Sequence, residues 1–134
     1  MPRSFHHSVR VPYAHVDQMG FVYYANHFVY YEMARSEMLR DAGLPYTEME
    51  ARGVMLPVVE AHSEYKQPAG FDDLLEIELR CTELKGARLR IEYTMTRGDD
   101  LIATGYTHHV CMSRDGRVMR PTPEIRSLLE KDDL

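Results

Sequence analysis

Residues 13–37 read YAHVDQMGFVYYANHFVYYEMARSE, a loop followed by the longest helical pattern in the chain. After Asn26, apolar residues recur at spacings of three and four, which is typical of one buried face of an amphipathic helix. They are Phe28, Tyr31, Ala34, Met38 and Ala42. Asn26 has the side chain of a good N-cap, and Gly43 with Pro45 end the pattern. The stretch therefore predicts a helix of roughly 16 residues that buries one face.

The segments on either side of this helix carry strand patterns. Alternate apolar residues predict a first strand over His6–Tyr13, and they are Val9, Val11 and Tyr13. A short helix over Thr47–Arg52 follows the long one, and residues 54–113 then read almost entirely as strands. A last segment, Pro123–Lys131, predicts a short surface helix.

Two of the later segments alternate strictly between apolar and polar residues, which is typical of strands with one buried face. The apolar members are Leu75, Ile77, Leu79 and Cys81 in the first segment and Leu89, Ile91, Tyr93 and Met95 in the second. Turn residues at Gly86, at Gly98–Asp100 and at Arg114–Gly116 separate the strands at hairpin spacing. We therefore expect an antiparallel meander.

This order of elements predicts an α+β fold in which a long central helix is wrapped by a curved antiparallel sheet of about five to six strands. One helix covers only one face of such a sheet, so the other face must meet solvent or a partner. Long edge strands also invite pairing with a second chain. We expect a homo-oligomer, with a homodimer as the smallest form and a homotetramer as the alternative.

Composition excludes several classes of protein. The chain has 134 residues, which predicts a single domain over residues 1–134. The 16 Lys and Arg against 21 Asp and Glu give a net charge of −5, which argues against a nucleic-acid partner. The longest strongly apolar stretch, 54–59, is far shorter than the roughly 20 residues that cross a bilayer, so no integral membrane association is expected.

The two cysteines and the N-terminal residues predict the compartment. Cys81 and Cys111 form neither a CxxC motif nor a disulfide framework, and the first residues lack the apolar core of a signal peptide. We therefore expect a cytoplasmic protein.

Two motifs resemble those of a known family. The first is an aspartate, two residues, a glycine, then V-x-Y and an asparagine that opens the central helix; its members here are Asp17, Gly20, Val22, Tyr24 and Asn26. The second is Y-x-x-P-A-x-x-D-D, which occupies residues 65–73 before a long strand. Together they resemble the hot-dog-fold acyl-CoA thioesterases. The likeness is closest to the 4-hydroxybenzoyl-CoA thioesterase branch and to the thioesterases encoded beside the Tol–Pal envelope system.

The resemblance implies a hot-dog fold and the hydrolysis of acyl-CoA thioesters with a small or aromatic acyl group, without a cofactor. It implies that Asp17 is the nucleophile or general base, that the backbone N–H of Tyr24 polarises the thioester carbonyl, and that Gly20 and Asn26 help to bind substrate. A carboxylate ahead of a helix start fits this chemistry, because unpaired N–H groups there favour developing negative charge. The alternative for Asp17 is an Asx turn, as in most loop aspartates.

Coenzyme A also carries phosphates that need cationic partners. Lys85, Arg88 and Arg90 cluster at and after the Gly86 turn, where the 4-hydroxybenzoyl branch places basic residues for the nucleotide phosphates. A solvated strand face explains the same cluster equally well.

Several other polar residues are candidates for the site. Glu32 and Glu37 are competing carboxylates on the helix, and we expect Glu32 to pair with Arg35 on its surface. We expect His15 to face solvent. Three histidines are candidate metal ligands, namely His62, His108 and His109. His108 and His109 are adjacent strand residues and so point to opposite faces, and no third ligand is suitably spaced. No metal site is therefore predicted.

Two other functions remain open. The same chemistry on an acyl carrier protein thioester would use the same residues. A non-catalytic hot-dog domain that binds acyl-CoA is the second alternative, although such a sensor has no use for a carboxylate aimed at the carbonyl. A hot-dog dehydratase or hydratase is less favoured, because those relatives place an Asp/His pair at the helix.

Overall fold

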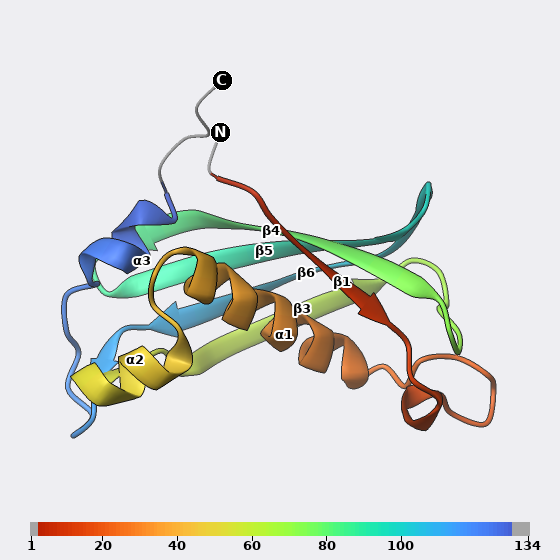
Figure 1. The fold of residues 1–134 in the computed structure, drawn as a ribbon, viewed down its shortest axis with the longest axis horizontal. Coiled ribbons are helices and arrows are strands. Elements are labelled where there is room, and N and C mark those ends of the chain that lie inside the picture. Colours follow the sequence, from red (N-terminus) through yellow and green to blue (C-terminus); the bar gives the residue numbers. More distant parts are fainter. Residues whose placement is uncertain (1–2, 130–134) are drawn as a thin grey trace.

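A long helix, α1 (Asn26–Asp41), lies across one face of an antiparallel sheet (Figure 1). The computed structural model describes residues 3–129. The sheet has five strands in the order β1-β4-β5-β6-β3. Their bounds are β1 Phe5–Arg10, β3 Val58–Tyr65, β4 Leu74–Lys85, β5 Arg88–Arg97 and β6 Asp100–Val110. The predicted α+β arrangement of one long helix on a five-stranded antiparallel sheet is confirmed.

Short elements complete the chain. The turn before α1 contains a 3-10 helix, η1 (Tyr13–His15), and α2 (Tyr46–Arg52) follows α1 as the sequence predicts. A two-stranded sheet pairs β2 (Val54–Met55) with β7 (Met112–Ser113). The last helix, α3 (Pro123–Ser127), is shorter than expected and is capped by Thr122, whose hydroxyl accepts from the N–H of Ile125. Residues 130 and 131 of the predicted helix lie outside the described residues.

The two alternating strands behave as predicted. Every second residue of β4 from Leu75 to Cys81 and of β5 from Leu89 to Met95 is buried beneath α1 or its neighbours. Their outward residues are charged or polar, so this face of the sheet is left for solvent or for a partner. The edge strand β3 also exposes Val58 and Val59.

Tyr31 fixes how closely α1 approaches the sheet. Its ring stacks on Tyr93 of β5 with 4.5 Å between ring centroids, and its hydroxyl lies 2.9 Å from the hydroxyl of Ser63 on β3. Gly105 of β6 lies under the same ring. A Cβ atom there would come within 2.9 Å of the Tyr31 ring and 2.7 Å of the His62 carbonyl oxygen, so this position requires glycine.

Two local predictions are wrong. Tyr13 is not part of the first strand; it lies in η1 and is 80% exposed, because β1 already ends at Arg10. Asn26 does not cap α1, since Ala25 occupies the N-cap position without a side-chain hydrogen bond and Asn26 is the first helical residue. Among the described residues, no helix is long and apolar enough to cross a membrane.

Candidate active site

The loop before α1 is a closed turn around Asp17. Val16 and Val22 pair as an isolated antiparallel bridge, and the N–H of Asp17 donates to the carbonyl of Phe21 at 2.8 Å. Gly20 donates to the carbonyl of Asp17 at 3.0 Å and has a φ of +83°, a left-handed conformation that favours glycine. The role of Gly20 in this chain is therefore first of all to close the turn.

The side chain of Asp17 also holds this turn. Its Oδ1 accepts from the N–H of Met19 at 2.9 Å and from the N–H of Phe21 at 3.2 Å. This is the Asx geometry that the sequence left as the alternative reading of Asp17. Both hydrogen bonds use the same oxygen, so the turn orients the carboxylate without involving Oδ2.

The second motif lies against this loop. The N–H of Val22 donates to the carbonyl of Ala69 at 2.8 Å, and a Cβ atom on Gly70 would come within 3.3 Å of the carbonyl oxygen of Gly20. Residues 65–73 and 16–22 therefore form the two walls of one site, although they are far apart in the sequence.

Arg97 at the end of β5 anchors the second motif. Its Nη1 donates to Asp73 Oδ2 at 2.9 Å and to the carbonyl of Pro68 at 3.2 Å. The N–H of Gly70 donates to the same Asp73 oxygen at 2.8 Å. That backbone hydrogen bond and the Arg97 guanidinium lower the pKa of Asp73. Arg97 thus ties the turn to the sheet.

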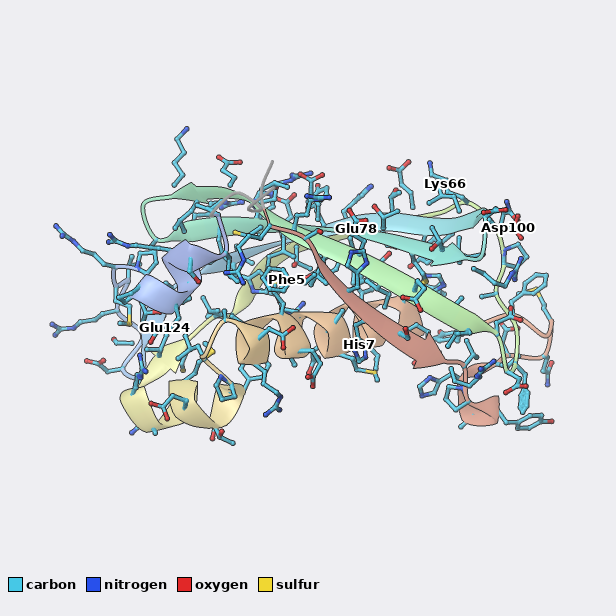
Figure 2. The ribbon with its side chains drawn as sticks, turned by 45° about the horizontal axis from the view of Figure 1, so that its top comes forward. Phe5, His7, Lys66, Glu78, Asp100 and Glu124 are labelled. Atoms are coloured by element: carbon cyan, nitrogen blue, oxygen red, sulfur yellow. The ribbon has the colours of Figure 1, made fainter. Side chains whose placement is uncertain are left out.

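A pocket of about 300 Å³ opens between the two motifs. Its lining is mostly apolar or aromatic and comprises Asp17, Met19, Phe21, Val22, Tyr24, His27, Tyr65, Lys66, Gln67, Pro68 and Ala69. Tyr65 holds the wall together, because its hydroxyl donates to the carbonyl of Tyr24 at 3.1 Å. Figure 2 shows Lys66 and Asp100 at this end of the sheet, with Glu124 at the opposite end.

At the start of α1, one residue that lines this pocket has an unpaired backbone N–H within the described chain. The N–H groups of Tyr23, Asn26 and His27 donate to carbonyls of the loop. Within residues 3–129, by contrast, no hydrogen bond uses the N–H of Tyr24. The residue predicted to polarise a carbonyl through its backbone and the predicted carboxylate, Asp17, therefore line one pocket.

His27 was not predicted as a site residue. It is 4% exposed, lies in the first turn of α1 and lines the pocket. Its ring meets Tyr65 edge to face, with 4.7 Å between centroids, and burial lowers its pKa to about 4. The signal for burial was its spacing of four from Tyr31 and seven from Ala34, which places it on the inward face of the helix.

Asn26 lies beside the pocket rather than in its lining. Its side-chain Nδ2 donates to the carbonyl of His15 at 3.2 Å, so it fastens the loop to the helix start. The expectation that His15 faces solvent is wrong. The His15 ring is half-buried, and its Nδ1 lies 2.9 Å from the hydroxyl of the fully buried Tyr30.

The basic cluster lies elsewhere in the chain. Lys85 and Arg88 flank the β4–β5 turn, at one end of β5, and Arg97 lies at the other end, beside the pocket. At ~3.3 Å per residue, the strand from Arg88 to Arg97 is about 30 Å long. The two ends of β5 lie at opposite ends of the sheet (Figure 1). Arg88 lies 3.7 Å from Glu60, and Arg90 lies 3.2 Å from Glu92. Within one chain these cations do not reach Asp17.

The helix carboxylates do not enter the pocket. Glu32 is exposed, and the expected Glu32–Arg35 pair is wrong, because Arg35 is buried and donates to the hydroxyl of Tyr93. Glu37 pairs with Arg40 at 3.4 Å on the helix surface.

The remaining histidines point to different faces. His109 is fully buried, whereas His108 lies on the outer face beside Arg88. His62 pairs with Glu64 on the same outer face. In the part of the chain that the structure describes, no group of three or more His, Cys, Asp or Glu side chains is arranged to hold a metal ion.

Fold and site together define a class of protein. Residues 11–129 match the model of the thioesterase-like superfamily, and the chain belongs to this family. The fold is the hot-dog fold predicted from the two motifs.

Individual relatives are similar along most of the chain. The hypothetical protein TT1821 from Thermus thermophilus has a crystal structure with a TM-score of 0.88 and 39% identity, covering 94% of this chain and 99% of that one. A 1,4-dihydroxy-2-naphthoyl-CoA hydrolase of Synechococcus elongatus is 29% identical over 85% of each chain. The acyl-CoA thioester hydrolase YbgC of Escherichia coli is 39% identical over 63% of each chain.

Proposed function

We propose that the protein hydrolyses acyl-CoA thioesters to the free acid and coenzyme A. One observation carries this proposal: the half-buried carboxylate of Asp17 and the unpaired N–H of Tyr24 belong to residues that line the same pocket. A carboxylate beside a free donor at a helix start supplies both an attacking or activating group and a partner for the oxyanion. The activities named for the Synechococcus and Escherichia relatives support the same reaction.

Asp17 acts on the thioester carbon in one of two ways. As a nucleophile, its carboxylate attacks the carbonyl carbon, expels coenzyme A as the thiolate and leaves an anhydride that water hydrolyses. As a general base, it takes a proton from the water that attacks the same carbon. Because Met19 and Phe21 hold Oδ1, Oδ2 is the reacting oxygen in both routes. The Tyr24 N–H binds the carbonyl oxygen, and one such donor contributes on the order of 3 kcal/mol to lowering the barrier.

The acyl group is small or aromatic. The pocket of about 300 Å³ is walled by the rings of Phe21, Tyr24 and Tyr65, which offer flat apolar surfaces to a ring or a short chain. The likeness of residues 17–26 to the 4-hydroxybenzoyl-CoA branch supports this range of substrates.

The working form is a homodimer or a homotetramer. β3 is an edge strand with Val58 and Val59 exposed, which favours pairing with a second copy. A second subunit also provides a route by which Lys85, Arg88 and Arg90 reach the nucleotide phosphates. Light scattering during size exclusion tests this: a monomer at micromolar concentration contradicts it.

Thiol release from acyl-CoA esters tests the proposed reaction. Asp17→Asn keeps an oxygen acceptor for Met19 and Phe21, so the loop stays closed while the carboxylate is lost. We expect the rate to fall by at least about 10²–10⁴-fold with an unchanged melting temperature. Asp99→Asn, on an exposed hairpin, is the matched control and keeps full activity.

Three results oppose the proposal. They are full activity of Asp17→Asn, no thiol release from short, aromatic or long acyl-CoA esters, and tight acyl-CoA binding without turnover, which identifies a sensor. Comparing one acyl group on CoA and on an acyl carrier protein separates the two thioesterase alternatives.

A further inference from the structure

We propose that His27 is a specificity-determining residue that donates a hydrogen bond from Nε2 to an oxygen on the bound acyl group. The inference rests on the proposed thioesterase activity and names the acyl groups the pocket prefers. His27 lines the pocket beside Asp17 and is only 4% exposed. It is therefore a polar side chain built into the wall rather than a surface histidine near it.

No protein group uses the polar atoms of His27. Its Nδ1 is fully enclosed without a hydrogen-bond partner, and no side-chain hydrogen bond of the described residues involves its ring. Two other polar side chains of the wall already have partners: the Tyr65 hydroxyl donates to the Tyr24 carbonyl, and Lys66 pairs with Glu64. Since Nδ1 is enclosed, Nε2 is the ring nitrogen left for a ligand, and an acceptor bound there gives it the hydrogen bond that no protein group supplies.

The surroundings of His27 set its charge and its tautomer. Burial lowers its pKa to about 4, so the ring is neutral at pH 7. The enclosed Nδ1 belongs to the first turn of α1, where the helix dipole favours a lone pair over a second proton. The proton therefore sits on Nε2, the ring nitrogen that a molecule in the pocket can reach.

The Nε2–H of His27 determines which acyl groups the pocket prefers. A neutral N–H in an aromatic wall pairs best with a neutral oxygen acceptor, such as a hydroxyl on a ring or on a short chain. An unsubstituted acyl group leaves the donor unpaired, and a site with an unpaired buried polar group discriminates against such a ligand. The pocket thus prefers acyl groups that bear an oxygen acceptor over the same skeleton without one.

Matched thioester pairs test the inference. The substrates are benzoyl-CoA with its three monohydroxy and three monoamino isomers, and butanoyl-CoA with 3-hydroxybutanoyl-CoA. For the wild type we expect higher kcat/KM on at least one hydroxylated member than on its parent. An amino group donates well but accepts poorly, so the amino isomers should behave like the parent.

Two variants isolate the role of His27. His27→Phe keeps the aromatic shape and removes the donor, so it should lower kcat/KM for the preferred hydroxylated substrate by about 10- to 100-fold and for the parent by less than threefold. His27→Gln restores a donor near the position of Nε2 and should recover part of the loss. His62→Phe, on the outer face of the sheet, is the control, and its kcat/KM for both substrates should equal that of the wild type. Circular dichroism and melting temperature verify folding of each variant.

The outcomes separate this inference from the proposed function. If wild type releases no thiol from any of these esters, the proposed activity for small and aromatic acyl groups fails and the inference fails with it. If the wild type turns over the esters without preferring any hydroxylated member, only the inference is overturned. The same holds if His27→Phe lowers all rates equally, which would place His27 at the thioester carbonyl. Should His27→Phe fail to fold, His27→Leu takes its place: loss of the hydroxyl preference supports the inference, and an unchanged preference overturns it.

Discussion

Arg35 of α1 donates a hydrogen bond from Nη1 to the hydroxyl of Tyr93 on β5, at 3.1 Å in the buried layer between helix and sheet. The Tyr93 hydroxyl lies 2.7 Å from that of Thr107, which lies 2.8 Å from Nε2 of His109. His109 Nδ1 lies 3.0 Å from the carbonyl oxygen of Leu56. Arg35 can only donate and the Leu56 carbonyl can only accept, so every donor in this chain points from the helix toward Leu56.

Removing the middle of this chain should destabilise the fold. Tyr93→Phe deletes the hydroxyl that accepts from Arg35, and within residues 3–129 Arg35 makes no ion pair with a carboxylate that could replace it. We expect the free energy of unfolding to fall by about 1–3 kcal/mol in urea denaturation. Tyr106→Phe removes a hydroxyl that donates to Glu60 on the exposed face and should cost clearly less. Equal losses in the two variants would contradict the role of the buried chain.

Acid should weaken the protein through its buried histidines. Burial lowers the pKa of both His109 and His27 from 6.5 to about 4. The unfolded chain therefore binds more protons between these values, and stability that is present above pH 6.5 is lost as the pH falls through 4. Protonated His109 would also need to donate toward Thr107, against the direction of the chain.

Unfolding free energies between pH 7.5 and 4 measure this effect. His109→Gln removes one titrating group, so its stability should depend less steeply on pH even if it is lower at pH 7. A curve parallel to that of the wild type would show that His109 is not responsible.

Arg97 should matter for activity more than for stability. Arg97→Gln loses the ion pair with Asp73, so residues 68–73 are held less firmly against Asp17. Because small displacements in a site slow the reaction strongly, we expect kcat/KM to fall by about tenfold, with a stability loss of about 1 kcal/mol. Arg117→Gln removes an exposed pair with Asp115 and should change neither value. Wild-type kinetics in Arg97→Gln would mean that the turn keeps its shape without this anchor.

The strands with a regular alternation of apolar and polar residues were the features best predicted from the sequence. β4 and β5 bury one face each, so alternation alone identified Leu75 to Cys81 and Leu89 to Met95 as core. The resemblance of two motifs supplied the fold family and directed attention to Asp17 and Tyr24. That the two motifs meet through Val22 and Ala69 required the structure, because the hydrogen bond joins residues far apart in the sequence.

The errors share one physical cause. Local spacing pairs Arg35 with Glu32 on the helix surface, because Tyr93, the residue that Arg35 binds in the interior, is 58 residues away. His15 was expected in solvent, since nothing in its own loop predicts the hydroxyl of Tyr30. The distance between Lys85 and Asp17 is not such an error, since Lys85 remains a proposed phosphate partner; it depends on the direction in which β5 runs, which spacing alone cannot give.

The order of strands also affects how the site is made during synthesis. β1 pairs with β4, with Phe5 opposite Leu79, and the loop that carries Asp17 connects β1 to α1. The hairpins of β4, β5 and β6 need only neighbouring residues, whereas β1 has to wait for a strand translated more than 60 residues later. The segment with the proposed catalytic carboxylate therefore leaves the ribosome among the first parts of the chain and is among the last to acquire its folded surroundings.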